Sequence, residues 1–360
     1  MNEFSKNFLN EDWKAMPDAP RLYVSGFGKH PGWNDHMDEI GLITDSLIKA
    51  KAILYEGIAH QVESAAWNNK GADKIAPGFD HVIHWRRFNE ALTGALWSST
   101  DGKGRSLYPM ITLAHCVAQP FAWQAEAVLP ALAEVGAKCR AAKTSYEVVT
   151  VLNGTQEALR GRLADKSVQP APGLSLGLKE WTGYFSREQE LLRRVLHSLA
   201  VNFAPFAPGS YAWCESKKAG QARSLRLPIV PGANPVASLN AWLVFLSTQL
   251  DPAVPLLGFL PAGRDWLDVI IGEPREADFI VLRTLPAATP LETSIPYQLA
   301  AGMSDHQSRL FADLARGEWP GISCFNGQSV ESNREEAAKW LAKFRVNFFS
   351  RFLKPTIPPF

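Results

Sequence analysis

The chain has 360 residues, and its 37 lysines and arginines nearly balance 36 aspartates and glutamates, leaving a formal net charge of +1. A chain of this length buries about 75% of its unfolded surface, so it needs no disulfide or metal to fold. The charge balance gives no electrostatic reason to expect nucleic-acid binding, and we expect partners to be recognised locally.

The first half of the chain is predicted to alternate strands and helices. The apolar run RLYVSGFG (21–28) ends in glycines and predicts a strand. Helical spacing of apolar residues predicts a helix over 44–67. The turn-rich stretch DGKGR (101–105) leads into SLYPMITLAHC (106–116), whose apolar and β-branched residues predict a second strand. Segments rich in alanine and leucine predict helices over 123–142 and 146–163.

The second half is predicted to begin with a helix over 188–201 and to continue with short strands in SYAWCES (210–216) and SLRLPIV (224–230). NPVASLNAWLVFLSTQL (234–250) predicts a helix, with Asn234 as its N-cap and Pro235 in the first helical position. Three closely spaced strands are predicted next, and the tail from about residue 294 is predicted to be helical. The three strands are VPLLGFLP (254–261), WLDVIIG (266–272) and DFIVLRT (278–284).

These elements predict an α/β fold with a mixed central sheet that contains antiparallel pairs and is covered by helices, with an added C-terminal helical extension. The connections between the three closing strands are too short for crossover helices, which disfavours an all-parallel order. We divide the chain into an N-terminal extension (1–20), an α/β domain (21–231), and an α/β continuation or second domain that ends in helices (232–360).

Cysteine usage and the N-terminus bear on the compartment. The first 20 residues are charged throughout and lack the apolar region of a signal peptide. No run approaches the ~18 apolar residues of a membrane span. The cysteines are far apart, as is typical of small core residues in a reducing compartment; they are Cys116, Cys139, Cys214 and Cys324. We therefore expect a cytoplasmic protein.

The loop GFGKHPGWNDH (26–36) gathers residue types that are common in catalytic sites. It does not match a phosphate-binding P-loop, because Lys29 is followed by His30 and the glycines are wrongly spaced. A metal site is an alternative. His30, His36, Asp35 and Asp38 fall in or beside this loop, and His81 and His84, close to Asp80, would share one face of a helix. No known metal-binding spacing is matched, so these groups are also compatible with ordinary loop and surface positions.

Nucleophilic catalysis has little support in the sequence. No G-x-S-x-G elbow is present. His115 and Cys116 are adjacent, and adjacent residues of a strand point to opposite faces, so they cannot form a nucleophile–base pair.

Two stretches resemble a known family. GKHPGWNDH is similar to the G-K-x-P-x-x-G-D-F signature of the TagF (ImpM/SciT) proteins associated with bacterial type VI secretion. HWRRFNEALTGALWSSTDGKGRSLYPMITLA is similar to the same family's W-R-F…D-x-V-G-R-x-F-P-L segment, and SYAWCES resembles its S-x-W-W strand. The matching positions are Gly28, Lys29, Pro31 and Asp35 in the first stretch and Trp85, Arg86, Phe88, Asp101, Gly104, Arg105 and Pro109 in the second.

The resemblance is clear over residues 22–113, looser up to 231, and does not cover the rest. The chain departs from the pattern where Asn34 and His36 replace the glycine and phenylalanine of G-D-F, where Lys103 replaces valine, and where Arg87 is one extra residue. The resemblance implies a non-enzymatic cytoplasmic accessory protein without a cofactor. It also implies a post-translational repressor that binds the forkhead-associated scaffold protein of the secretion system. The alternative is a metal-dependent hydrolase that uses His30, His36, His81 and His84.

We expect Asp35 and Arg105 to form a carboxylate–guanidinium pair that joins two loops at one edge of the sheet, because the planar fork of arginine suits such pairing. Trp33 lies in the Gly/Pro/Asn loop and is a candidate for contact with a partner.

The C-terminal segment KWLAKFRVNFFSRFLK (339–354) places aromatic residues at helical spacing among basic ones. Such a helix could lie on an anionic membrane surface or in a groove of a partner. We favour packing of the aromatic face against the protein's own domain.

Overall fold

The computed structural model describes residues 21–63, 78–85, 90–106, 108–117, 119, 121–164, 206, 223–274 and 276–282. The strands are β1 (Arg21–Gly28), β2 (Gly78–Trp85), β3 (Glu90–Trp97), β4 (Met110–Val117), β5 (Arg223–Pro228), β6 (Leu256–Pro261) and β7 (Trp266–Ile271). The helices are α1 (Asp45–Glu63), α2 (Phe121–Trp123), the π-helical turn η3 (Gln124–Val128), α3 (Leu129–Ala141), α4 (Ser145–Ala164), α8 (Pro235–Gln249) and the 3₁₀ helix η5 (Glu276–Leu282).

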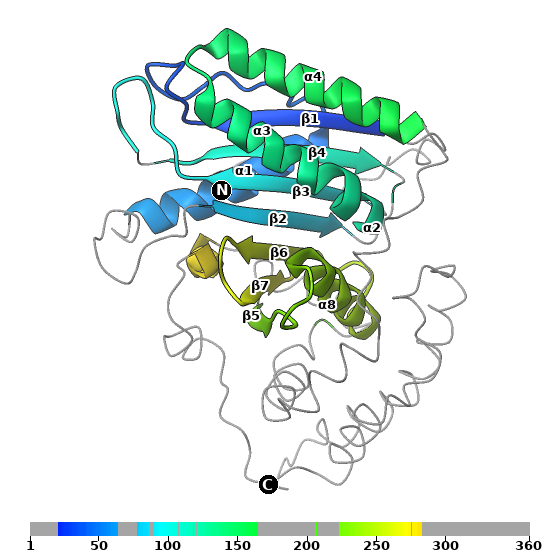
Figure 1. The fold of residues 1–360 in the computed structure, drawn as a ribbon. Coiled ribbons are helices and arrows are strands. Elements are labelled where there is room, and N and C mark those ends of the chain that lie inside the picture. The colour runs from blue at the N-terminus through cyan, green and yellow to red at the C-terminus, as the bar shows by residue number, and fades with distance from the viewer. Residues whose placement is uncertain are drawn as a thin grey trace, which may run out of the picture.

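The seven strands form one sheet in the order β1-β4-β3-β2-β6-β7-β5 (Figure 1). All six neighbouring pairs are antiparallel. The prediction of an α/β fold with antiparallel pairs covered by helices is therefore confirmed, and antiparallel pairing extends through the whole described sheet. The sheet contains strands from both sides of the predicted boundary at residue 231. The predicted C-terminal extension, the helix over 188–201 and the strand in SYAWCES lie outside the described residues.

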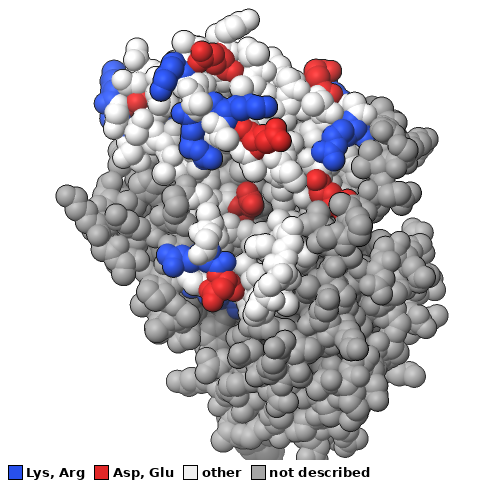
Figure 2. All heavy atoms as spheres, viewed as in Figure 1, with Lys and Arg blue, Asp and Glu red and all other residues white. Residues whose placement is uncertain are grey.

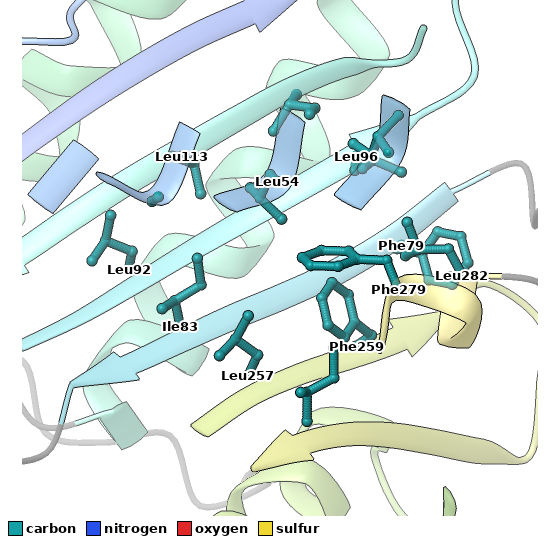
Figure 3. Close-up of a cluster of buried hydrophobic side chains, with 14 of the residues drawn as sticks. Leu54, Phe79, Ile83, Leu92, Leu96, Leu113, Leu257, Phe259, Phe279 and Leu282 are labelled. Atoms are coloured by element: carbon teal, nitrogen blue, oxygen red, sulfur yellow. The ribbon is translucent and has the colours of Figure 1, made fainter. Parts of the chain in front are cut away.

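The sheet is buried on both faces, and each face has its own core. On one face, α1 and η5 cover side chains of β2, β3, β4 and β6, as Figure 3 shows for Leu54, Phe279, Ile83 and Leu113. On the other face, α3 and α4 pack against side chains of β1, β3 and β4. Helix α8 lies on the same side as α3, because Leu239 closes over Gly258 of β6 and lies next to Val82 of β2. Because successive residues of a strand point to opposite faces, a strand between two helical layers is buried along its whole length, as all residues of β3 and β4 are.

Several predicted elements are confirmed. Strand β1 covers the predicted 21–28, β6 and β7 fall within predicted strands, and β4 and β5 overlap predicted strands and extend one residue beyond them. The side chain of Asn234 accepts a hydrogen bond from the Val236 N–H at 2.9 Å, so it caps α8 as expected. The helix predicted over 123–142 is interrupted at its start by η3.

Two predictions are wrong. DFIVLRT was expected to be a strand, but Glu276–Leu282 forms the 3₁₀ helix η5. Its apolar side chains pack against α1 instead of pairing with β7, and Phe279 lies directly over Gly57, where a Cβ would be 2.1 Å from the ring. His81 and His84 lie on strand β2, not on a helix, and therefore point to opposite faces of the sheet.

The outer edge of β1 makes hydrogen bonds with side chains and with a neighbouring loop. The Val24 N–H donates to Gln156 Oε1 at 2.9 Å, and Arg160 Nε donates to the Leu22 carbonyl at 3.1 Å. Gly26 exchanges two backbone hydrogen bonds with Ile40 at 2.9 and 3.0 Å. Helix α4 and the loop after β1 thus cover this edge.

Acidic and basic side chains are interspersed on the described part of the face that carries α3 and α4 (Figure 2). Among the described residues, none of the helices is both long enough and apolar enough to cross a membrane.

Candidate functional site

The candidate site lies where β1 ends and β4 begins. Gly28 has a φ of 111°, and a Cβ there would be 2.1 Å from the Pro109 carbonyl oxygen, so only glycine fits at this bend. The Lys29 N–H donates to the same carbonyl at 3.1 Å. The loop that leaves β1 is thereby fixed beside the loop that enters β4.

The first loop is held in place by its own histidine. His30 is 1% exposed; its Nδ1 accepts a hydrogen bond from the Gly32 N–H at 3.0 Å, and its Nε2 lies 2.7 Å from the Cys139 carbonyl. Because Nδ1 accepts, Nε2 carries the proton and donates to the carbonyl. Both ring nitrogens are used in positioning the loop. Trp33 is half-buried, not fully exposed, and its Nε1 donates to Asp38 at 3.1 Å.

The second loop is organised by Asp101, whose side chain is 0% exposed. Its Oδ1 accepts hydrogen bonds from the backbone N–H groups of Lys103 and Arg105, both at 3.0 Å. Its Oδ2 accepts from Lys29 Nζ at 2.8 Å and from Arg105 Nε at 2.7 Å. Gly104, with a φ of 76°, completes the turn. All four bonds are short, so this buried carboxylate is fully satisfied.

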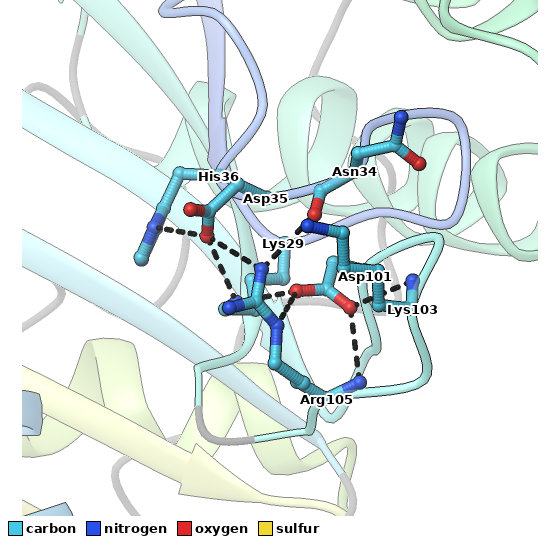
Figure 4. Close-up of polar contacts among 7 residues, drawn as sticks. All are labelled: Lys29, Asn34, Asp35, His36, Asp101, Lys103 and Arg105. Carbon is cyan, nitrogen blue, oxygen red and sulfur yellow. Dashed lines mark hydrogen bonds and ion pairs between the residues drawn. The ribbon is translucent and has the colours of Figure 1, made fainter.

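Asp35 brings the two loops together from the solvent side (Figure 4). Its Oδ1 lies 3.1 Å from Arg105 Nη2, 3.4 Å from Lys29 Nζ and 3.4 Å from His36 Nδ1. Arg105 Nη2 also donates to the Asn34 carbonyl at 3.0 Å. The predicted pair of Asp35 and Arg105 is therefore confirmed. We call Lys29, Asp35, Asp101 and Arg105 the ion-pair cluster.

The two carboxylates of the cluster have different surroundings. Burial alone would raise the pKa of Asp101, but hydrogen bonds from Lys29 and from the backbone and guanidinium of Arg105 hold it well below the ordinary value. The hydrogen bond from Lys29 also lowers the pKa of Asp35, and the charge of Arg105 adds to this. Asp35 is 66% exposed, however, so its ion pairs are screened by solvent.

An aromatic group borders the cluster. The ring of His36 lies 5.1 Å from that of Tyr108 and 6.0 Å from that of Tyr55, and the two tyrosines stack at 5.6 Å. Burial raises the pKa of Tyr55 to about 12, so its hydroxyl stays protonated. Neither tyrosine stands out in the sequence, because they are 53 positions apart and only the sheet brings them together.

The structure brings some of the predicted site residues together and separates others. Lys29, Asp35, Asp101, Gly104 and Arg105 meet at the start of β4. Trp85 lies at the opposite end of the sheet from this cluster, because it pairs with Glu90, which in turn pairs with Val117 at the end of β4. Lys49 Nζ lies 5.3 Å from the centroid of the Trp85 ring. Pro31 is exposed in the first loop, and Arg86 lies outside the described residues.

The four histidines of the hydrolase alternative do not form one site. His30 is engaged by backbone groups, and His36 lies at the exposed end of the ion-pair cluster. His81 is 1% exposed, and burial lowers its pKa to about 3, which keeps it neutral. His84 points to the opposite face of β2. Within the described ranges, His, Cys, Asp and Glu form no group of three that could hold a metal ion.

A second polar cluster, which the sequence did not predict, lies between β4 and the start of α1. His115 of β4 has its Nδ1 3.0 Å from the Thr44 hydroxyl and its Nε2 3.6 Å from Glu90 Oε2, to which Ser46 donates at 2.7 Å. Thr44 also accepts a hydrogen bond from the Leu47 N–H at the start of α1. The cluster therefore anchors the N-terminus of α1 to the sheet. A signal was available, since Thr44 is the first residue of the predicted helix and is of a type that is preferred as an N-cap.

Comparisons with known proteins give a distant structural likeness. No protein-family model matches the chain, and no curated protein matches it. Among solved structures, the crystal structure of PA0076 from Pseudomonas aeruginosa PAO1 is similar at 14% sequence identity, over 78% of this chain and 100% of that one, with a TM-score of 0.36.

Proposed function

We propose that this protein is a non-enzymatic cytoplasmic accessory or regulatory protein of a bacterial type VI secretion system. In this proposal it acts by binding a scaffold protein of the system, of the forkhead-associated type, as a post-translational repressor. The proposal comes from the resemblance of residues 22–113 to the TagF proteins.

One observation supports it most. The two sequence stretches that carry the resemblance are separate in the chain, and Asp35 and Asp101 are 66 positions apart, yet the charged residues of both stretches meet in one cluster. Lys29 and Asp35 come from the first stretch, and Asp101 and Arg105 come from the second. A shared local structure explains why both stretches would keep these residue types at these positions.

The geometry also suits a binding surface. Arg105 is 44% exposed, but its guanidinium is held by Asp101 and by the Asn34 carbonyl, so little side-chain entropy remains to be lost when a partner binds. Arginine and aromatic residues are enriched among the side chains that dominate binding energy. A surface of this kind represses by occupying the scaffold, without bond chemistry. The hydrolase alternative has no comparable support, because its four histidines are dispersed.

The test is an affinity purification of the tagged full chain from its own cytoplasm, with mass spectrometry of the bound proteins. The variant Asp35→Ala/Arg105→Ala removes the exposed pair of the ion-pair cluster. The matched control is Glu157→Ala/Arg160→Ala, which removes another exposed pair whose charged atoms are also 3.1 Å apart.

We expect type VI secretion components to be recovered with the unaltered chain and with the control, and to be depleted with the cluster variant while its circular dichroism is unchanged. Recovery of no type VI component would contradict the proposed function. Equal recovery of type VI components with the cluster variant and the control would support the proposed partner but would show that the ion-pair cluster is not the binding surface.

A further inference from the structure

Two carboxylates share the cations of the ion-pair cluster, and they do so unequally. Asp101 is buried and receives Lys29 Nζ at 2.8 Å and Arg105 Nε at 2.7 Å. Asp35 is exposed and lies farther from the same two side chains, at 3.4 Å from Lys29 Nζ and 3.1 Å from Arg105 Nη2. Asp101 holds the two cationic side chains from the buried side, and Asp35 contacts the same two side chains from the solvent side.

The position that Asp35 occupies does not depend on Asp35. Lys29 has a side chain that is only 4% exposed and is anchored by Asp101. Arg105 is anchored by Asp101 and by the Asn34 carbonyl. With Asp35 removed, the two cations would still converge on one point at the surface, opposed by a single buried carboxylate. That point is a preformed site for a negative group.

Asp35 itself is easily replaced. Only Oδ1 takes part in the contacts with Lys29, Arg105 and His36, and the residue lies on a surface loop with 66% of its side chain exposed. Ion pairs between exposed groups contribute little free energy, because water competes for both partners. Little free energy is therefore lost when an incoming negative group displaces the Asp35 side chain.

We propose that Asp35 is a built-in occupant of a carboxylate-binding position formed by Lys29 and Arg105, and that an Asp or Glu side chain of the partner protein takes its place on binding. The inference rests on the proposed function, since it specifies the chemistry that the partner presents to this site. The choice of a carboxylate follows from the present occupant, whose size and charge the two cations already accommodate. Exposed Lys103 in the second loop adds a further positive charge at the rim.

The test measures the site without the secretion system. A short fluorescein-labelled oligoglutamate peptide is titrated with the full chain at low ionic strength, and binding is followed by fluorescence anisotropy. The variants are Asp35→Asn and Arg105→Gln. Their matched controls are Glu157→Gln and Arg160→Gln, a pair in which the arginine also donates to a backbone carbonyl and is 39% exposed.

Asp35→Asn removes the competing carboxylate and is expected to tighten peptide binding about two- to fivefold, the range that corresponds to an exposed ion pair. Arg105→Gln is expected to weaken binding about tenfold. The two controls are expected to bind as the unaltered chain does. If Arg105→Gln proves unfolded by circular dichroism, the Asp35→Asn result decides alone.

Three results would overturn the inference. Asp35→Asn binding no tighter than Glu157→Gln would show that Asp35 is not a competitor, and the absence of peptide binding by Asp35→Asn would show that no such site exists. Binding of a matched phosphoserine peptide without binding of oligoglutamate would show that the site accepts a phosphate and not a carboxylate. None of these measurements involves a secretion component. A negative peptide result therefore leaves the proposed function intact, and a negative affinity purification leaves the carboxylate-binding position intact.

Discussion

Replacement of Lys29 by Met is the most direct perturbation of the ion-pair cluster. Methionine keeps nearly the same length and apolar stem, so packing around the side chain is preserved while the ammonium is removed. The change breaks the 2.8 Å hydrogen bond to Asp101 and the 3.4 Å contact with Asp35. Asp101 is left buried, with three of its four donors.

The expected cost follows from these contacts. A hydrogen bond to a charged group contributes about 1.5–3 kcal/mol, and breaking a buried ion pair costs about 3–5 kcal/mol when the remaining charge is uncompensated. Here the remaining charge is largely compensated by Arg105 and two backbone N–H groups. We therefore expect Lys29→Met to lower the free energy of unfolding by about 2–3 kcal/mol.

Urea denaturation followed by tryptophan fluorescence measures this free energy, since the chain has 12 tryptophans. The control is Lys138→Met, which removes a lysine that is 61% exposed and lies 3.6 Å from Glu134. This control is expected to change stability by less than about 0.5 kcal/mol. An equal loss of unfolding free energy in both variants would show that the buried contact of Lys29 with Asp101 does not stabilise the cluster.

Three further predictions concern the same part of the fold. The pKa of Asp101 in the folded state lies below its ordinary value of 3.8. The ionised carboxylate therefore stabilises the fold above pH 3.8, and this stabilisation is lost as the pH falls through the folded-state pKa. Lys29→Met raises this pKa, so acid unfolding, followed by circular dichroism, is expected to begin at higher pH in the variant. Gly28→Ala is expected to cost about 3 kcal/mol or more in urea denaturation, because its Cβ would collide with a backbone carbonyl, whereas Gly104→Ala, with nothing within 4 Å of its Cβ, is expected to cost about 1–2 kcal/mol. Thr44→Val is expected to destabilise by about 1 kcal/mol more than Thr144→Val, because both hydroxyls cap a helix but only that of Thr44 also contacts His115; equal urea midpoints would contradict this.

The sequence predicted elements where local signals were strong. Strand β1 could be recognised because an apolar run ends in glycines, and α8 because Asn234 and Pro235 mark its start. The hairpin of β2 and β3 was not assigned, because every residue of β3 is buried and such a strand lacks the alternation of a half-exposed one. For the same reason, an apolar run such as that of η5 does not reveal whether it pairs in a sheet or packs against a helix.

Part of the candidate site could also be predicted. The pairing of Asp35 with Arg105 follows from two loops, one leaving the first predicted strand and one entering the second. The central role of Asp101 could not be predicted, because a sequence does not tell which of two nearby carboxylates is buried. The burial depends on the register of β1 and β4, which sets Gly28 opposite Met110 and places the Lys29 ammonium beside the second loop.

The covered edge of β1 restricts how other chains can attach to this protein. An edge strand with free backbone groups is a template for strand addition by another chain, and proteins commonly block it. Here Gln156, Arg160 and the pairing of Gly26 with Ile40 use hydrogen-bonding groups that an added strand would need. A partner that approaches from this side therefore has to bind through side chains and not by adding a strand, and the same block protects the β1 edge from edge-to-edge aggregation.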